Sequence, residues 1–175
     1  MDHLRMPRLD QIGIYVKDLD RTVERYGKIY GIGPWLVLEG EVENCVERGR
    51  EVEVKGRIAI GYTGRIQLEL IQILEGSNFY LDTLGDRDEG LHHLGFAVNN
   101  IEERLRAFRE AGIDVLNRGT LKQMGLTIDF AYMDTMEDGG VILEFIQTSL
   151  LGLKVSQAPW MVKLAARMQR RFGRS

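Results

Sequence analysis

The chain has a single cysteine, Cys45, so it can form no internal disulfide, and its cysteine content gives no sign of an oxidising compartment. Its first residues, MDHLRMPRLD, contain no apolar segment of the kind found in secretory signal peptides. No apolar run approaches the roughly 20 residues that cross a bilayer as a helix. These absences favour a cytoplasmic protein and make membrane contact an unfavoured interpretation.

Acidic residues are absent after Glu144, where the chain carries six basic residues. Because the whole chain has a net charge of −3, residues 1–144 sum to −9. An acidic body argues against nucleic acid as the main partner. At 175 residues, with 44% apolar and 28% charged residues, the chain fits one globular domain or two small modules that share a core.

Two segments of the chain resemble each other at an offset of 82 residues. They are LDQIGIYVKDLDRTVERYGKIYGI (9–32) and LHHLGFAVNNIEERLRAFREAGI (91–113). Each contains a short alternating strand, an Asx residue suited to cap a helix, and an amphipathic helix that ends near a glycine. The helices are predicted over residues 19–30 and 101–111. Equivalent residues include Leu9 and Leu91, Gly13 and Gly95, and Asp18 and Asn100.

Each predicted helix is followed by three strand-like stretches separated by turns. These stretches cover roughly 34–41, 52–62 and 65–73 in the first half, and 113–117, 126–133 and 140–147 in the second. The pattern β-α-β-β-β therefore occurs twice, in modules over about 8–73 and 91–148, with loop sequence between them. One such module is too small for a core of its own. We expect an α+β fold in which two paired βαβββ modules of one domain, residues 1–149, form a shared curved sheet around a cavity.

Each module places a glutamate inside its last strand, Glu69 in IQLELIQ and Glu144 in VILEFIQ. A buried carboxylate is costly unless it meets a cation, a metal or hydrogen-bond donors. The first strands offer one inward polar residue each, Gln11 and His93, which are equivalent under the repeat. By strand alternation His92 should point to the opposite face, so it is interpreted as structural.

Gln11, Glu69, His93 and Glu144 can converge on one point if the two modules face each other. Together they offer three oxygens and one nitrogen, which suits a divalent ion such as Zn, Ni, Co, Mn or Fe(II). Taken singly, each residue has an ordinary structural interpretation, because strand histidines and glutamines are commonly satisfied core or surface groups. The prediction of a metal site rests on four residues at symmetry-related positions.

The motifs DQIGIYVKDLDRTVERYGKIYGIGPW, IQLELIQ, GLHHLGFAV and GVILEFIQ, over about residues 9–147, resemble the vicinal oxygen chelate superfamily. This superfamily includes glyoxalase I, methylmalonyl-CoA epimerase, extradiol dioxygenases and bleomycin-resistance proteins. The first ligand is a histidine in many members and is Gln11 here, but one class of glyoxalase I uses a Gln, Glu, His, Glu set in this order. Tyr15 and Ile73 replace polar residues that bind glutathione in glyoxalases, so the resemblance does not extend to glutathione.

The resemblance implies a metal-dependent isomerase, epimerase or lyase that removes a proton next to the carbonyl of a small compound or an acyl-CoA. It implies Zn, Ni, Co or Mn as cofactor, Gln11, Glu69, His93 and Glu144 as ligands, and Glu144 as the base. It also implies a homodimer. The alternative is a metal-free protein that binds or sequesters a small molecule, as the resistance proteins do.

Residues 150–175 are predicted to end in a basic amphipathic helix, with Ser156 or Gln157 near its start and Gly173 past its end. The helix could pack on its own body or on a partner subunit, clamp the phosphates of CoA, or lie on a membrane surface. Docking on the acidic body is the favoured interpretation. The predicted apolar stripe consists of Trp160, Met161, Leu164, Ala165, Met168 and Phe172.

Overall fold

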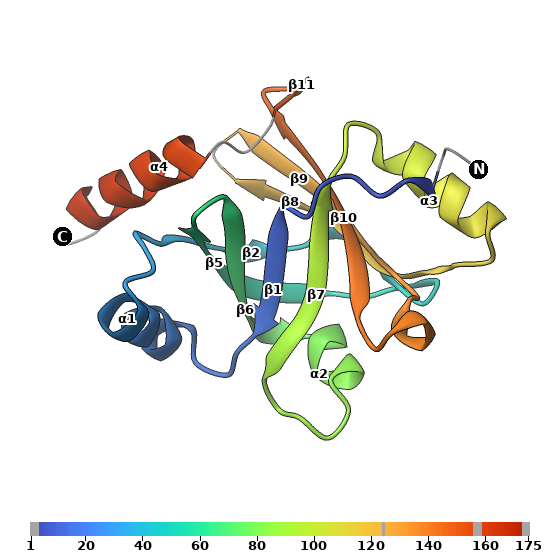
Figure 1. Cartoon of the computed structure of the whole chain (residues 1–175), viewed down its shortest axis with the longest axis horizontal. Helices are drawn as coiled ribbons and strands as arrows, with labels where there is room; N and C mark the ends of the chain where they lie inside the picture. Colours follow the sequence, from blue (N-terminus) through green and yellow to red (C-terminus); the bar gives the residue numbers. More distant parts are fainter. Residues whose placement is uncertain (1–3, 124, 156–158, 173–175) are drawn as a thin grey trace.

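The structure is a computed structural model that describes residues 4–123, 125–155 and 159–172. Within these residues a curled mixed sheet is flanked by four α-helices (Figure 1). The strands are β1 (Gln11–Tyr15), β2 (Leu36–Glu41), β3 (Glu43–Glu47), β4 (Arg50–Glu51), β5 (Val54–Thr63), β6 (Ile66–Gly76), β7 (Gly90–Ala97), β8 (Val115–Gln123), β9 (Leu126–Met133), β10 (Ile142–Leu150) and β11 (Leu153–Lys154). The helices are α1 (Leu19–Tyr30), α2 (Phe79–Thr83), α3 (Ile101–Glu110) and α4 (Pro159–Phe172), with the short 3-10 helix η2 (Met136–Asp138).

The sheet has the strand order β2-β5-β6-β1-β7-β10-β9-β8-β3-β4, and β11 pairs with β10. The two modules meet where β1 pairs antiparallel with β7. On either side of this junction the last strand of a module lies parallel to its first strand, β6 beside β1 and β10 beside β7. The two halves therefore follow the same order outward from the junction. The predicted α+β fold of two paired βαβββ modules is confirmed, and the modules pair within one chain.

Helices α1 and α3 cover the outer face of the sheet on opposite flanks (Figure 1). As predicted, Asp18 and Asn100 cap them, because each side chain accepts a hydrogen bond from a backbone N–H of the first turn. Their apolar faces pack on β5 and β6 in one module and on β9 and β10 in the other. The buried residues of these contacts are Leu19, Ala59 and Leu70 for α1, and Ile101, Leu105, Phe108, Ala131 and Phe145 for α3.

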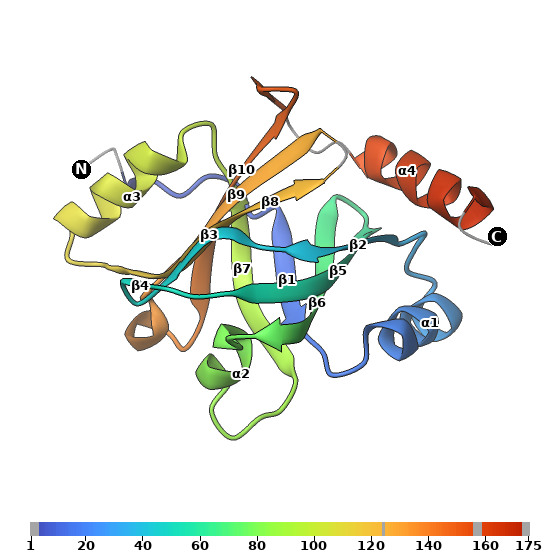
Figure 2. The ribbon, with the colours of Figure 1, turned by 180° about the vertical axis from the view of Figure 1, so that it is seen from behind.

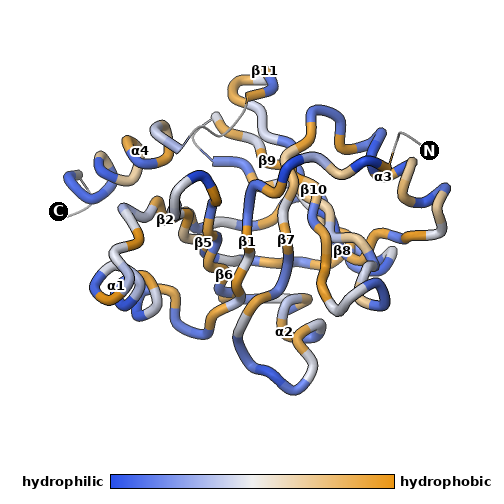
Figure 3. The backbone as a smooth tube through the Cα atoms, in the orientation of Figure 1, coloured by the Kyte–Doolittle hydropathy of each residue, from blue (hydrophilic) through white to orange (hydrophobic). Residues whose placement is uncertain are grey.

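The sequence patterns do not predict the β3–β4 hairpin or helix α2. The hairpin of β3 and β4 turns at Arg48 and Gly49, whose φ angles are 46° and 79°. Helix α2 lies in the predicted loop, where the Asn78 side chain accepts a hydrogen bond from the Leu81 N–H at 3.2 Å. Both elements are too short to show a hydrophobic period. The stretch after α2 is hydrophilic, as Figure 3 shows.

The sheet curls until its two ends approach each other, because β3 pairs with β8 and β2 contacts β8. Seen from behind, β2 and β3 cross in front of the central strands β1 and β7 (Figure 2). Side chains alternate between the two faces along each strand. On β6, Leu70 packs beneath α1, whereas Glu69 and Ile71 line the space enclosed by the sheet. This enclosed face holds the candidate site.

Helix α4 docks on β2 and β5, as predicted, but through a different face. The Gln169 side chain accepts a hydrogen bond from Val37 N (2.9 Å) and donates one to Val37 O (2.6 Å). Since β2 is an edge strand, these bonds satisfy backbone groups that lack a neighbouring strand. Val162 and Ala166 are buried beside them, while the predicted stripe residues Trp160, Met161, Leu164 and Met168 are exposed.

The described helices include none that is both long and apolar enough to cross a bilayer. The predicted cap residues of the last helix, Ser156, Gln157 and Gly173, lie outside the described residues. The division into a domain of residues 1–149 and a separate segment of residues 150–175 stays a prediction.

Candidate metal centre

The four predicted ligands lie on adjacent strands at the junction of the two modules. In one row across the sheet, Gly13 of β1 is flanked by Glu69 of β6 and His93 of β7. In the next row, Gly95 of β7 is flanked by Gln11 of β1 and Glu144 of β10. The side chains of Gln11, Glu69, His93 and Glu144 are all buried. The pairing of β1 with β7 therefore brings together residues that are far apart in the chain.

Gln11, Glu69 and Glu144 converge on the Nε2 atom of His93. This nitrogen lies 3.1 Å from Glu144 Oε2, 3.3 Å from Gln11 Oε1 and 3.6 Å from Glu69 Oε2. The potential ligand atoms of Glu69, His93 and Glu144 all lie within 4.8 Å of one another. The structure thus clusters all four of the predicted residues.

Two glycines make room for this cluster. A Cβ atom on Gly13 would lie only 1.8 Å from the His93 ring, and a Cβ atom on Gly95 would lie 2.6 Å from Gln11 Oε1. Real Cβ atoms do not approach other atoms so closely, so any side chain at either position would displace a member of the site. The repeat aligned these glycines with each other, but their role is visible only in the structure.

His92 lies beside His93 and not on the opposite face. The register of β1 with β7 skips His92, which makes it the extra residue of a β-bulge and cancels the alternation expected along a regular strand. Its Nδ1 lies 3.0 Å from His93 Nδ1, and its Nε2 lies 2.8 Å from the Thr83 hydroxyl. His92 therefore supports His93, and the prediction that it points to the opposite face is wrong.

The hydrogen-bond chain determines which nitrogen of His93 faces the cluster. Thr83 Oγ1 donates to the Phe79 carbonyl oxygen at 2.9 Å, so it accepts from the Nε2–H of His92. Burial, together with the charge of His93, lowers the pKa of His92 to about 2, so the ring is neutral and its Nδ1 is an acceptor. The Nδ1–H of His93 then donates to His92. The Nε2 of His93 therefore faces three oxygen atoms. It carries a proton when the ring is charged and a free lone pair when the ring is neutral.

Electrostatics favours a positive charge at this position. Burial lowers the pKa of His93, but the nearby carboxylates of Glu144 and Glu69 more than offset burial and raise it to about 9. Burial raises the pKa of Glu69, an effect that His93 partly opposes. Glu144 Oε2 is buried, and its ion-pair partner in the described part of the chain is His93 Nε2 at 3.1 Å. A cation between these groups would satisfy all of them.

The donor set fits a divalent transition metal. It combines one imidazole nitrogen, two carboxylates and one amide oxygen, and the carboxylates can neutralise a 2+ charge. The Nδ1–H of His93 is held by a second residue, as is usual for histidines that bind metals. Gln11 is oriented in the same way, because its Nε2 donates to Gln67 Oε1 at 2.6 Å. The neighbours His92, Gln67 and Thr83 were not identified as functional from the sequence.

A cavity inside the curled sheet reaches the two carboxylates. Glu69 and Glu144 contribute to its wall, which is otherwise mainly apolar. Tyr80 of α2 and Tyr132 of β9 stand next to the carboxylates, and their hydroxyls are 3.0 Å apart. Burial, followed by the nearby carboxylates, raises the pKa of both tyrosines well above the usual value. Both phenols therefore stay protonated; one hydroxyl donates to the other, and the remaining O–H can donate a hydrogen bond toward the cavity.

A second groove approaches the cluster from the other side. Its lining includes Gln11 and Gln67 together with the basic residues Arg8, Arg65 and Lys154. Ile146 lies between this groove and the apolar cavity, since it lines both. The cluster is therefore bordered by an apolar space on one side and by a groove with basic residues on the other.

Comparison with known proteins identifies the family and its fold. An uncharacterized protein of Bacillus subtilis (strain 168), YqjC, is 27% identical over 142 residues, which cover 81% of this chain and 93% of that protein. The hypothetical protein BH1468 from Bacillus halodurans C-125 superposes with a TM-score of 0.57 at 24% identity, over 86% of this chain and 96% of that one.

Methylmalonyl-CoA epimerases have the same fold. The enzyme from Mycobacterium tuberculosis superposes with a TM-score of 0.56 at 20% identity, over 83% of this chain and 94% of that one. An epimerase in complex with methylmalonyl-CoA and NH4+ superposes with a TM-score of 0.55 at 23% identity, over 86% of this chain and 99% of that one. Residues 10–132 match the sequence model of one family. The chain therefore belongs to the Glyoxalase/Bleomycin resistance protein/Dioxygenase superfamily.

Proposed function

We propose that this chain is a metal-dependent enzyme that moves a proton next to a carbonyl group, as an epimerase, isomerase or lyase. The observation that carries the proposal is the direction of His93 Nε2. Its other ring nitrogen donates to His92, while Nε2 faces Glu144, Gln11 and Glu69 oxygens within 3.6 Å. Four electron-pair donors that face one another repel each other, and a metal ion among them would bind all four as ligands.

Gln11, Glu69, His93 and Glu144 would hold the divalent metal, with Zn, Ni, Co or Mn as candidates. The bound ion would act as a Lewis acid that stabilises negative charge on a substrate oxygen. Because two ligands are carboxylates, the site remains close to neutral when the metal is bound. The other residues of the site orient these ligands through the His92 and Gln67 hydrogen bonds.

Glu144 is the proposed base. Its carboxylate lines the apolar cavity, where it can take a proton from a substrate carbon when the metal holds it only loosely. Glu69 also borders the cavity, but we assign it first to the metal. Tyr80 and Tyr132 are protonated donors near both carboxylates and can orient the substrate.

A small carbonyl compound or an acyl-CoA fits this arrangement. The epimerases of the same fold act on methylmalonyl-CoA, as the name of the complex indicates. Arg8, Arg65 and Lys154 beside the second groove are suited to bind phosphate groups of a CoA moiety. We also propose that the chain forms a homodimer, since the exposed apolar side chains of α4 offer a surface for a second copy.

A hydrogen-exchange assay tests the proposal. Propionyl-CoA, incubated in deuterium oxide with the metal-loaded protein, should exchange its α-hydrogens, and exchange should stop when a chelator removes the metal. Glu144→Gln keeps an oxygen donor but loses basicity, so it should retain metal and slow exchange by roughly 10²–10⁴-fold. The exposed variant Glu137→Gln is the matched control and should exchange at the wild-type rate. Rapid exchange by Glu144→Gln would refute the assignment of the base.

A metal-free binding protein is the second candidate. It is favoured by the raised pKa of His93, because a proton on Nε2 could satisfy the two carboxylates without a metal. Metal analysis of protein purified without chelator separates the two candidates. About one equivalent of a transition metal supports the enzyme, whereas metal-free protein that still binds small molecules supports the second candidate.

A further inference from the structure

A buried asparagine lines the apolar cavity two strands away from Glu144, one of the proposed metal ligands. Asn117 of β8 is only 4% exposed and lines the cavity. It pairs with Tyr132 of β9, which pairs in turn with Glu144 of β10, so the three residues form one row across the sheet. Two strand spacings separate the first and last of them, which is about 10 Å.

Among the described residues, the side chain of Asn117 has no strong hydrogen-bond partner. Its contacts there are with the Cys45 thiol, at 4.0 Å from Oδ1 and 3.9 Å from Nδ2. A thiol is a weak donor and a weak acceptor, whereas an amide offers two N–H donors and two lone pairs. Burial raises the pKa of Cys45, so the thiol stays neutral and does not become a stronger partner. Burying an amide with so little compensation is costly.

No other described residue of the wall makes a hydrogen bond to the Asn117 side chain. Most neighbours around the cavity are apolar, and Ser77 is already engaged, since its hydroxyl donates to Glu47 at 2.8 Å. The amide therefore has capacity for a group that enters the cavity. A ligand that ends in a hydrogen-bonding group would satisfy it.

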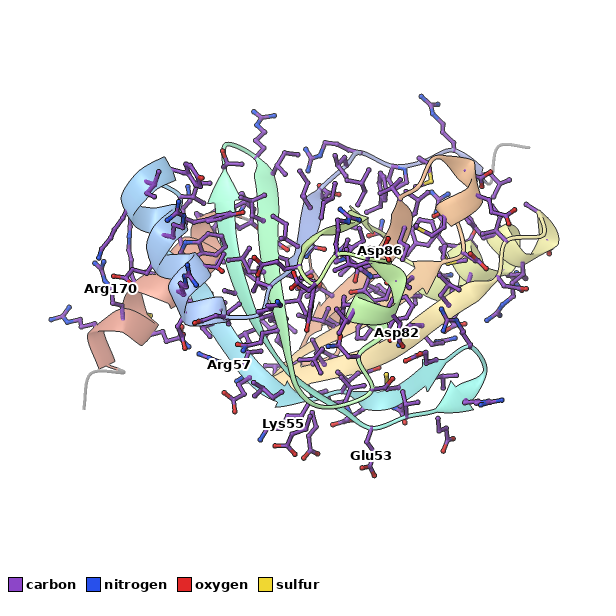
Figure 4. All side chains as sticks on the ribbon, turned by 90° about the horizontal axis from the view of Figure 1, so that it is seen from below. Glu53, Lys55, Arg57, Asp82, Asp86 and Arg170 are labelled. Atoms are coloured by element: carbon purple, nitrogen blue, oxygen red, sulfur yellow. The ribbon has the colours of Figure 1, made fainter. Side chains whose placement is uncertain are left out.

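The charges around this cavity indicate that the group is neutral. Lys122 is the one basic side chain among the described residues of the wall, and its Nζ lies 2.7 Å from Glu43. Glu39, also in the wall, lies 3.5 Å from Arg57. The labelled Glu53 and Lys55 point away from the body (Figure 4). No unpaired cation of the described wall is left for a phosphate or a carboxylate.

We propose that Asn117 is a specificity-determining residue that binds a neutral polar group at the far end of an otherwise apolar substrate. The substrate class is a carbonyl compound, free or as the acyl part of a thioester, with an apolar body of about 10 Å that ends in a hydroxyl or carbonyl group. This inference rests on the proposed function, because it places the reacting carbonyl at Glu69 and Glu144. It adds that the other end of the substrate carries a neutral hydrogen-bonding group.

A pair of ligands tests the proposal. Octanohydroxamic acid and its ω-hydroxy analogue share a head group that binds a metal if one is present and donates hydrogen bonds to the carboxylates if none is present. Their dissociation constants are measured by calorimetry on wild-type protein, Asn117→Leu and Asn117→Ser. In wild-type protein the ω-hydroxy ligand should bind more tightly relative to octanohydroxamic acid than it does in Asn117→Leu. The ratio of the two dissociation constants should differ by about tenfold between the two proteins, because Asn117→Leu loses one buried hydrogen bond to the ω-hydroxyl group. Asn117→Ser, which keeps a hydroxyl, should show a smaller change.

Ile128→Val is the matched control, since Ile128 is buried in the same wall. It should weaken both ligands equally and leave their ratio unchanged. If the ratio is the same in wild-type protein and Asn117→Leu, or if neither ligand binds, the proposal is wrong. Metal content is measured on the same samples. Metal-free protein that shows the expected change of ratio would refute the proposed enzyme while supporting the role of Asn117.

Discussion

Metal binding to this protein should release a proton from His93. In the metal-free protein the carboxylates of Glu144 and Glu69 raise the pKa of His93 to about 9, so at pH 7 the ring is almost fully protonated. The metal needs the lone pair of Nε2, which carries that proton. Each metal ion bound at pH 7 should therefore displace about one proton.

The size of the effect follows from this pKa. Well below pH 9 the proton competes with the metal, so the apparent affinity should rise roughly tenfold per pH unit. Because half of the rings are still protonated at pH 9, the rise between pH 7 and pH 9 should be about fiftyfold. Isothermal titration calorimetry in buffers of different ionisation enthalpy counts the proton, and competition with a chelator measures the affinity at each pH.

Stability should change with pH in the same window. Because the folded pKa of His93 lies above its ordinary value of 6.5, the ion pair stabilises the metal-free protein fully below pH 6.5. This contribution is lost as the pH rises through about 9. The melting temperature of metal-free protein should fall over this range, and saturating metal should suppress the fall. Metal binding that releases no proton and has the same affinity at pH 7 and pH 9 would refute the reasoning.

Three further predictions concern single substitutions. Gly13→Ala should abolish metal binding, because the new Cβ would lie 1.8 Å from the His93 ring. The control Gly27→Ala should bind metal normally, because its Cβ would meet no atom closer than 3.8 Å, and elemental analysis compares the metal content of the two variants. His93→Ala should lose most of its metal, whereas Gln11→Ala should lose less because water can replace a neutral amide oxygen; full metal content in His93→Ala would contradict the four-ligand site. Gln169→Leu should destabilise the protein by about 1 kcal/mol in chemical unfolding, since two hydrogen bonds to the edge strand β2 are lost, and an unchanged midpoint would show that they contribute nothing.

The sequence alone determined the architecture of this protein, because its evidence is local and repeated. Asp18 and Asn100 precede helical periods and cap the two helices, and the offset of 82 residues aligns two equivalent modules. The four site residues were also recognisable, since two glutamates inside apolar strands require compensation. Elements as short as α2 and the hairpin of β3 and β4 left no period to recognise.

Only the tertiary structure decided how the site is supported. The bulge that places His92 beside His93 depends on the register between β1 and β7, which alternation along one strand does not reveal. Gly13 and Gly95 are needed because side chains from neighbouring strands lie close to their Cα atoms. The apolar stripe of α4 is exposed because the helix turns a different face, the one that carries Gln169, toward the edge strand β2. Asn117 acquires its place in the same row as Glu144 through the pairing of β8, β9 and β10. A sequence specifies local patterns directly, but residues far apart in the chain acquire shared surroundings only when the strands pair and the sheet curls.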